Sequence, residues 1–339
     1  MVQGGPSSGE LFVVFLNSLP IEAILAAKGV TDQKATSNMF VDDHNSVVSG
    51  QNEEELEKNI IKEFSRIQVY LDNHRMKINP CKTQLMFLSP STLQKETNIQ
   101  IDGALITHQE SIRILGITLT PDLKWDAHIN KGPINMIKSL NAKNALLRSV
   151  SNHIPSKALA LVANNLVNST ILYGAPIWAT TTKDNIDLIQ KCQTRAARLI
   201  SKQKWHNGIR THRQILFNKL DWPNVQQMVN SSTLNLIHRA KSHNTSKGII
   251  KMFNIIIPRI PRGLPTFILR HNGTHKRSAN NFTAHATASF NRLPPELRCP
   301  IMSDNKFKVE VKRYVRANWL LPQHYNEVHD KNRKRTPGD

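Results

Sequence analysis

Charge is distributed very unevenly along this chain of 339 residues. Residues 1–120 hold 10 Lys and Arg against 14 Asp and Glu, a net charge of 10 − 14 = −4. Residues 121–339 hold 35 against 11, a net charge of 35 − 11 = +24. A division of this size predicts two parts with different roles, and the length suffices for about two domains. A basic half most often faces phosphate, and less often an anionic membrane surface.

Composition excludes several classes of protein. Hydrophobic residues make up 39% of the chain, too many for a chain that is disordered throughout. The longest apolar runs, residues 11–16 and 158–163, are far shorter than the ~20 residues of a membrane span. Cys81, Cys192 and Cys299 lie too far apart to form a disulfide framework. We therefore expect an intracellular protein, nuclear or cytoplasmic, that is not secreted and has no membrane partner.

The first 125 residues combine strand and helix signals. Residues 38–49 predict a β-hairpin whose polar tip is Asp42-Asp43-His44-Asn45. Asn52 followed by Glu55 predicts the start of a helix. That helix carries one apolar stripe, made of Leu56, Ile60, Phe64, Ile67 and Leu71. Residues 84–89 and 112–120 favour strands. This order predicts an α+β layer in which helix covers one face of an antiparallel sheet.

After Pro121 the pattern becomes helical. Residues 134–150, 156–167 and 184–202 predict helices. The last of these carries four cations at spacings of four, three and four, which are Lys191, Arg195, Arg198 and Lys202. Such a row is either a solvated face or a phosphate-binding one. Only three acids lie between residues 183 and 221, so few ion pairs can neutralise the row.

The C-terminal hundred residues are basic and punctuated by proline. Residues 222–295 contain no Asp or Glu but ten Lys and Arg. The prolines at 258, 261 and 265 predict an extended connector. A last amphipathic helix follows around Phe307, and the basic run at 331–335 predicts a disordered tail. We predict three regions: residues 1–125, a helical region at 126–240, and a basic region at 241–339.

Asp42 and Asp43 are the first candidates for chemistry. Adjacent carboxylates at a hairpin tip supply the oxygen ligands that Mg²⁺ prefers, and such carboxylates bridge the metals of two-metal phosphoryl transfer. The alternative is that Asp-Asp-His-Asn is simply a favourable turn sequence. The dipeptide alone favours the turn.

Six motifs change that balance because they follow one another in a characteristic order between residues 3 and 298. They are Gln3-Gly4 with Leu11-Phe12, Phe40-Val41-Asp42-Asp43, Asn79 with Lys82-Thr83, Leu115-Gly116 with Trp125 and His128, Tyr173-Gly174 with Trp178, and Phe290-Asn291 with Leu293-Pro294. In this order they resemble the reverse transcriptases of non-LTR retrotransposons of the jockey type. The resemblance implies a polymerase palm in residues 1–125 and a helical thumb in residues 126–240.

The resemblance also implies roles for individual residues. Asp42 would be a direct ligand of Mg²⁺, with Asp43 as its partner, and Lys82 would lie near the triphosphate. Gln3, Gly4 and Phe40 would lie against the template and the incoming nucleotide, and the Leu115-Gly116 turn would hold the primer end. The cations of residues 184–202 would contact phosphates. The partners implied are an RNA template, a DNA primer and deoxynucleoside triphosphates.

The chain also departs from the family pattern. A further catalytic Asp precedes the Gln-Gly motif in this family, and here that motif begins at Gln3. Val41 replaces the usual Ala, and His44 replaces an apolar residue or Thr. We therefore expect a partial palm and a chain that does not polymerise alone. Two alternatives remain: a non-catalytic module that binds RNA or an RNA–DNA hybrid by charge, and a decayed copy without activity.

Overall fold

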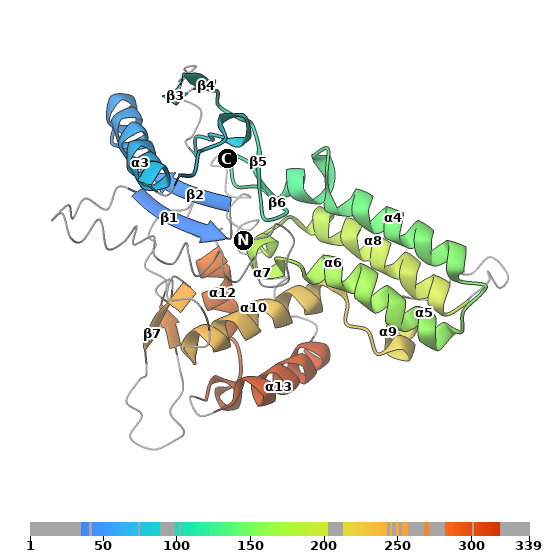
Figure 1. Ribbon diagram of the computed structural model, residues 1–339. Helices are drawn as coiled ribbons and strands as arrows, with labels where there is room; N and C mark the ends of the chain where they lie inside the picture. The colour runs from blue at the N-terminus through green and yellow to red at the C-terminus, as the bar shows by residue number, and fades with distance from the viewer. Residues whose placement is uncertain are drawn as a thin grey trace, which may run out of the picture. The chain divides into compact units, whose positions relative to one another are not determined.

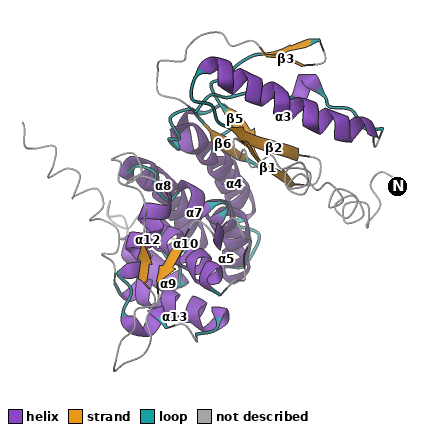
Figure 2. Ribbon diagram, turned by 90° about the vertical axis from the view of Figure 1, so that its left-hand side faces the viewer, coloured by secondary structure: helices purple, strands orange, loops and turns teal. Residues whose placement is uncertain are grey.

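The computed structural model describes residues 35–40, 43–73, 75–88, 99–101, 103–202, 213–242, 245, 249–250, 253–256, 268–270, 282–299 and 302–318. The chain divides into two compact units. The first comprises Met1–Arg113 with Thr120–Leu123, and the second comprises Ile114–Leu119 with Lys124–Asp339. The structure contains both helices and two-stranded sheets, so the predicted α+β class is confirmed, with helix predominating (Figures 1 and 2).

The first unit begins with a β-hairpin. Strands β1 (Ala35–Phe40) and β2 (Asp43–Val48) are antiparallel, and Phe40 lies opposite Asp43. The predicted tip is therefore wrong in part, because Asp43, His44 and Asn45 lie within β2. Only two residues of sequence separate the strands, so pairing extends further than the polar composition indicates.

Helix α3 (Glu53–Asn73) confirms the predicted helix and its start. The Asn52 Oδ1 atom accepts a hydrogen bond of 2.8 Å from the Glu55 amide, and the Glu55 carboxylate accepts one of 2.7 Å from the Gln51 amide. These bonds satisfy amides that the first helical turn leaves without partners. The apolar stripe of α3 packs with Val48 of β2 in a small core around Ile60, Ile99 and Ile106.

The later strands of this region are shorter than predicted. Strands β3 (Ile99–Ile101) and β4 (Ala104–Ile106) pair with each other, but residues 84–88, the described part of the first predicted strand, form no strand. Within that predicted strand, Leu85 makes an isolated bridge to His108, and the Phe87 amide donates to the His108 ring (3.2 Å). The His108 side chain thus accepts the hydrogen bond that a backbone carbonyl of a neighbouring strand would otherwise accept from Phe87. The prediction of one strand over 112–120 is also wrong: β5 (Ile112–Ile114) and β6 (Ile117–Leu119) flank a turn at Leu115-Gly116.

The second unit is built from helices around a buried core (Figure 1). Its first helical elements are η2 (Ala127–Lys131), α4 (Met136–Val150), α5 (Ser156–Ala163), η3 (Asn164–Asn168), α6 (Ser169–Leu172), α7 (Ala175–Trp178), α8 (Lys183–Ile200), α9 (Arg213–Leu220) and α10 (Val225–Lys241). Helices α4 and α8 lie side by side and share buried Leu140, Leu147, Ile189 and Ala196. The three predicted helices are confirmed, although the second continues through η3 and α6 to Leu172.

A second core joins α10 to the C-terminal elements. Strands β7 (Asn254–Ile256) and β8 (Ile268–Arg270) pair, and α12 (Phe282–Asn291), η5 (Pro295–Arg298) and α13 (Asp304–Ala317) follow. Leu234 and Ile237 of α10 pack there against Phe290 and Phe307, while Val225 of α10 belongs to the first core. Helix α10 therefore links the predicted regions 126–240 and 241–339. The proline connector and the basic tail lie outside the described residues.

Candidate functional site

Asp43 lies on the exposed face of its hairpin. Residues opposite each other in paired strands share a face, so Asp43 shares one with Phe40, whose side chain is 58% exposed. The alternate face carries Ser46, whose hydroxyl donates to Glu63 of α3 at 3.2 Å. Asp43 and Phe40 therefore face away from α3, where a ligand can reach them. Asp42, Gln3 and Gly4 lie outside the described residues.

His44 occupies the face of β2 that is turned toward α3. Burial lowers its pKa, and the nearby Arg66 guanidinium lowers it further, while the Glu63 carboxylate acts in the opposite direction. Glu63 is 5% exposed and pairs with Arg66 at 2.7 Å. His44, which departs from the family pattern, thus packs beside the ion pair of Glu63 and Arg66.

The Asn79-x-x-Lys82-Thr83 motif forms a short capped turn. The Asn79 side chain accepts from the Cys81 amide (3.1 Å), and the Thr83 hydroxyl donates to the Asn79 carbonyl (3.0 Å). These bonds hold the 3-10 turn η1 (Pro80–Lys82) and leave Lys82 exposed at its end. Asn79 and Thr83 thus serve the local fold and present Lys82 to solvent.

Metal ions in proteins are held by several His, Cys, Asp or Glu side chains that lie close together. Among the described residues, no group of three or more His, Cys, Asp or Glu side chains is arranged to hold a metal ion. Asp43 by itself supplies one carboxylate, fewer than Mg²⁺ needs from a protein site shared by two metals. Asp43 therefore does not form a magnesium site with other residues in the described part of the chain.

The Leu-Gly and Tyr-Gly motifs meet in the second unit. The Tyr173 hydroxyl donates to the Leu115 carbonyl at 2.5 Å, and its ring passes beside Gly116. Leu115 and Gly116 have φ values of 47° and 82°, a conformation that costs glycine little. The Tyr173 side chain remains 56% exposed. Tyr173 therefore fixes the Leu115-Gly116 turn, which was predicted to hold a primer end.

The Tyr173-Gly174-x-Pro176-x-Trp178 segment is itself a tight corner. Gly174 has a φ of 59°, and a Cβ atom there would lie 2.8 Å from the Ile117 side chain. Trp178 is fully buried, and its indole donates to the Tyr173 carbonyl (3.1 Å). The motif therefore encodes a close approach between β6 and the turn before α7.

The Trp-x-x-His motif, which begins at Trp125, is hydrogen-bonded to the segment that follows Trp178. The Trp125 indole donates to the Thr180 hydroxyl (3.0 Å), and the Asn185 amide donates to Asp126 (2.7 Å). This bond, followed by that of Lys131, lowers the pKa of Asp126. The ring of buried His128 accepts from the Thr118 amide at 3.5 Å. Residues 115–128 and 173–185 are thus joined at several points, which no single motif indicates.

The predicted cation row lies on α8 and just beyond it. Lys191, Arg195 and Lys202 are exposed and Arg198 is half-buried, while Arg195 also donates to Asn141 of α4 (2.9 Å). Toward the N-terminus of α8, Asp184 and Asp187 occupy the same side of the helix as the cations. Acidic side chains are stabilised there by the positive end of the helix dipole. The positive charge therefore gathers at the C-terminal half of α8.

A buried amide network fixes the opposite face of α8, and the sequence reasoning missed it. Gln193 is fully buried and donates to Asn168 (3.0 Å) and to the Pro223 carbonyl (3.0 Å). Gln190 donates to Gln193 and accepts from the Val225 amide (3.0 Å). In the sequence, the only sign of this network was the presence of two glutamines beside the apolar stripe of residues 184–202. The network orients α8 and so sets the direction of its cation row.

None of the helices in the described ranges combines the length and hydrophobicity that a bilayer crossing requires. Comparison with protein families gives no matching family model, and no solved structure matches the chain. A curated relative does match: the "Probable RNA-directed DNA polymerase from transposon BS" of Drosophila melanogaster is 28% identical over 174 residues. The alignment covers 51% of this chain and 18% of the relative, so the chain spans less than a fifth of that protein. This relative confirms the resemblance of the chain to a reverse transcriptase of a non-LTR retrotransposon.

Proposed function

We propose that the chain is part of the reverse transcriptase of a non-LTR retrotransposon, with palm residues in its first region and nucleic-acid-binding helices in its second. The observation that carries this proposal is the similarity to the transposon polymerase of Drosophila, together with the order of the six motifs. The parent reaction is the RNA-templated addition of deoxynucleotides to a DNA 3′ end.

In the complete polymerase, Asp42 and Asp43 would hold Mg²⁺, which when bound activates the primer hydroxyl and stabilises the leaving oxygens. Lys82 would place a positive charge beside the triphosphate. The exposed positions of Asp43 and Lys82 support these assignments. Gln3, Gly4 and Phe40 would position the template and the nucleotide, and the Leu115-Gly116 turn the primer.

The helical region at 126–240 would act as a thumb over the primer–template duplex. The cations of α8 are suited to its phosphates because backbone contacts fix the position of a duplex without reading its sequence. The buried amides beneath α8 support this role, since they hold the row in one orientation.

A second candidate is a module that binds RNA or an RNA–DNA hybrid without catalysis. The net charge of +24 in residues 121–339 favours this candidate, because a surface of this kind binds phosphate whether or not the palm is functional.

An incorporation assay tests both candidates. The purified 339-residue chain is given a DNA primer on an RNA template, labelled deoxynucleotide and Mg²⁺, with hybrid binding measured in parallel. We expect binding but no incorporation. Incorporation that Asp42→Ala abolishes would show a polymerase competent by itself, and failure to bind the primer–template would contradict both candidates.

A further inference from the structure

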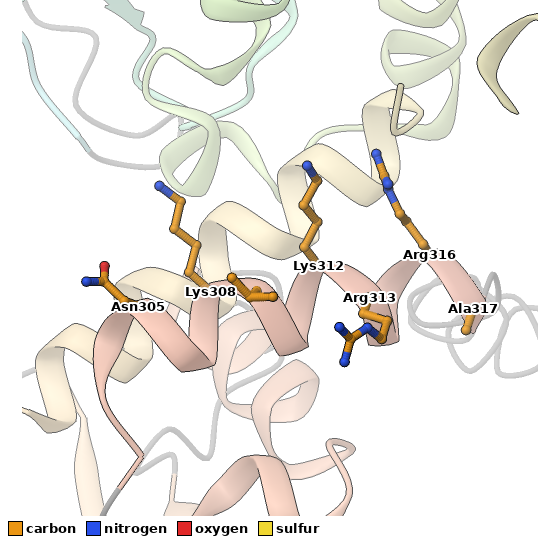
Figure 3. Close-up of a pocket in the computed structure, with 7 residues that line it drawn as sticks. Asn305, Lys308, Lys312, Arg313, Arg316 and Ala317 are labelled. Atoms are coloured by element: carbon orange, nitrogen blue, oxygen red, sulfur yellow. The ribbon is translucent and has the colours of Figure 1, made fainter. Parts of the chain in front are cut away.

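The C-terminal helix α13 presents a row of cations that the sequence motifs do not include. Lys308, Lys312 and Arg316 follow one another at intervals of four residues, so their Cα atoms are about 6 Å apart along the helix axis. The three side chains project from the same side of α13, and Arg313 projects from the other (Figure 3). This repeat is close to the separation of successive phosphates along a nucleic-acid strand.

Helix α13 is rigidly fixed by its apolar face. Phe307, Val311 and Val315 are at most 2% exposed and pack in the second core. The helix starts at a capped residue, and its first turn is tied to α10 by a hydrogen bond of 3.0 Å from the Ser242 hydroxyl to Asp304. The apolar face of α13 is already buried, and on the rest of the helix only Val309 remains as a large exposed apolar side chain. One valine is too little apolar surface for the helix to enter a lipid bilayer. This favours a phosphate backbone over a membrane as the ligand.

The charges at the centre of the row are not neutralised by neighbouring acids. Glu310 pairs with Arg313 at 2.9 Å, and Arg316 donates to Asp221 at 2.5 Å, which ties the end of the row to the loop after α9. Within the described ranges, no carboxylate forms an ion pair with Lys308 or Lys312. Both lysines are exposed and line an open groove of about 870 Å³ along α13.

We propose that this groove binds the sugar–phosphate backbone of a nucleic-acid strand, with Lys308 and Lys312 contacting successive phosphates. The inference rests on the proposed nucleic-acid-binding function and adds to it a second surface, separate from the α8 row. Arg316 is not counted as a phosphate contact, because its guanidinium is already paired with Asp221. Contacts of this kind do not depend on base sequence.

The test compares three double variants of the full chain that each remove two exposed charges. Lys308→Gln with Lys312→Gln changes the α13 groove, Lys191→Gln with Arg195→Gln changes the α8 row, and Lys157→Gln with Lys306→Gln is the matched control. Affinity for a labelled RNA–DNA hybrid is measured by fluorescence anisotropy over a series of salt concentrations. Single-stranded RNA, duplex DNA and phosphatidylserine vesicles serve as alternative ligands, and thermal unfolding confirms that each variant is folded.

We expect the α13 variant to bind the hybrid several-fold more weakly than the control variant, and its salt slope to fall by about two. Preference among the three nucleic acids then identifies the strand. If the α13 variant binds like the control while the α8 variant weakens, this inference is overturned and the proposed function stands. If the native chain binds none of the nucleic acids, or binds vesicles alone, both are overturned.

Discussion

Tyr173 belongs to one of the six family motifs, and its hydroxyl serves the fold. The hydrogen bond to the Leu115 carbonyl closes a contact between residues 58 positions apart. The ring meanwhile remains more than half exposed beside Leu115. One residue can therefore fix the turn and still present a surface to a nucleic acid.

Removal of that hydroxyl should destabilise the second unit. Tyr173→Phe keeps the ring but leaves the Leu115 carbonyl without this donor, so we expect a loss of about 0.5–1.5 kcal/mol in the free energy of unfolding. Denaturant unfolding measures it. Tyr314→Phe is the matched control, since no hydrogen bond of its hydroxyl is seen among the described residues. Equal effects of the two substitutions would contradict the structural role of Tyr173.

His238 should make the chain sensitive to acid. Its side chain is 1% exposed, stacks on Phe307 at 4.0 Å between ring centroids, and bonds the Met302 carbonyl through Nε2 (3.0 Å). Burial lowers its pKa to about 4, with a further contribution from the Lys241 ammonium, and the Asp304 carboxylate opposes both. Between pH 6.5 and 4 the unfolded chain therefore binds a proton that the folded chain does not.

Stability should accordingly be lost as pH falls from about 6.5 to about 4, by up to about 3 kcal/mol from this residue. Thermal unfolding of the native chain and of His238→Gln at pH 7 and pH 5 measures the contribution. The variant should be less stable at pH 7 but lose less on acidification. Because His285 and His44 also have lowered pKa values, the difference between the two chains is the relevant quantity. The same loss in both would refute the assignment.

At the scale of elements, the turns at Gly116 and Gly174 should lose different amounts of stability when the glycine is replaced by alanine. Gly116→Ala meets nothing closer than 3.5 Å and suffers the backbone cost of its φ of 82°. Gly174→Ala adds a clash with Ile117 at 2.8 Å. We expect about 1–2 kcal/mol of destabilisation for Gly116→Ala and more for Gly174→Ala. Ile117→Val removes the clashing methyl and should recover part of the Gly174→Ala loss in a double-mutant cycle. An additive cycle would contradict the close approach.

The α8 row makes its own prediction. Lys191→Gln with Arg195→Gln should reduce the salt slope of hybrid binding by about two, because each cation that contacts a phosphate releases about one counterion. The fold should persist, since the buried amides lie on the opposite face of α8. Unchanged binding would identify the row as a solvated face, the alternative that the sequence left open.

Periodic elements could be predicted from the sequence, and irregular ones could not. The apolar stripe and the Asn52 cap identify α3 because a helix repeats its environment every few residues. The failures are local: His108 replaces a strand partner for Phe87, and the Leu115-Gly116 turn divides one expected strand into two. The motifs contain Leu115 and Tyr173, but the hydrogen bond between these two residues depends on tertiary packing. Lys308 and Lys312 were visible as basic residues four positions apart, yet only the structure shows that their side of α13 is exposed.

For the whole molecule, the division of charge follows the division of the chain closely. The first unit contains the carboxylates of the Asp-Asp motif, and the second contains both cation rows on helices fixed by buried cores. Attraction to phosphate should therefore arise almost entirely from the second unit. The distribution fits the proposed function, in which chemistry and duplex binding occupy different regions.

The salt dependence of binding tests this account most directly. Affinity of the full chain for an RNA–DNA hybrid is measured between 50 and 200 mM salt, roughly the range over which counterion release is large. Four contacts from α8, or six with α13 included, predict a slope of log affinity against log salt between about −3.5 and −5.5. Absence of binding, or binding with a slope shallower than about −1, would contradict the claim that the basic unit holds a nucleic acid by its backbone.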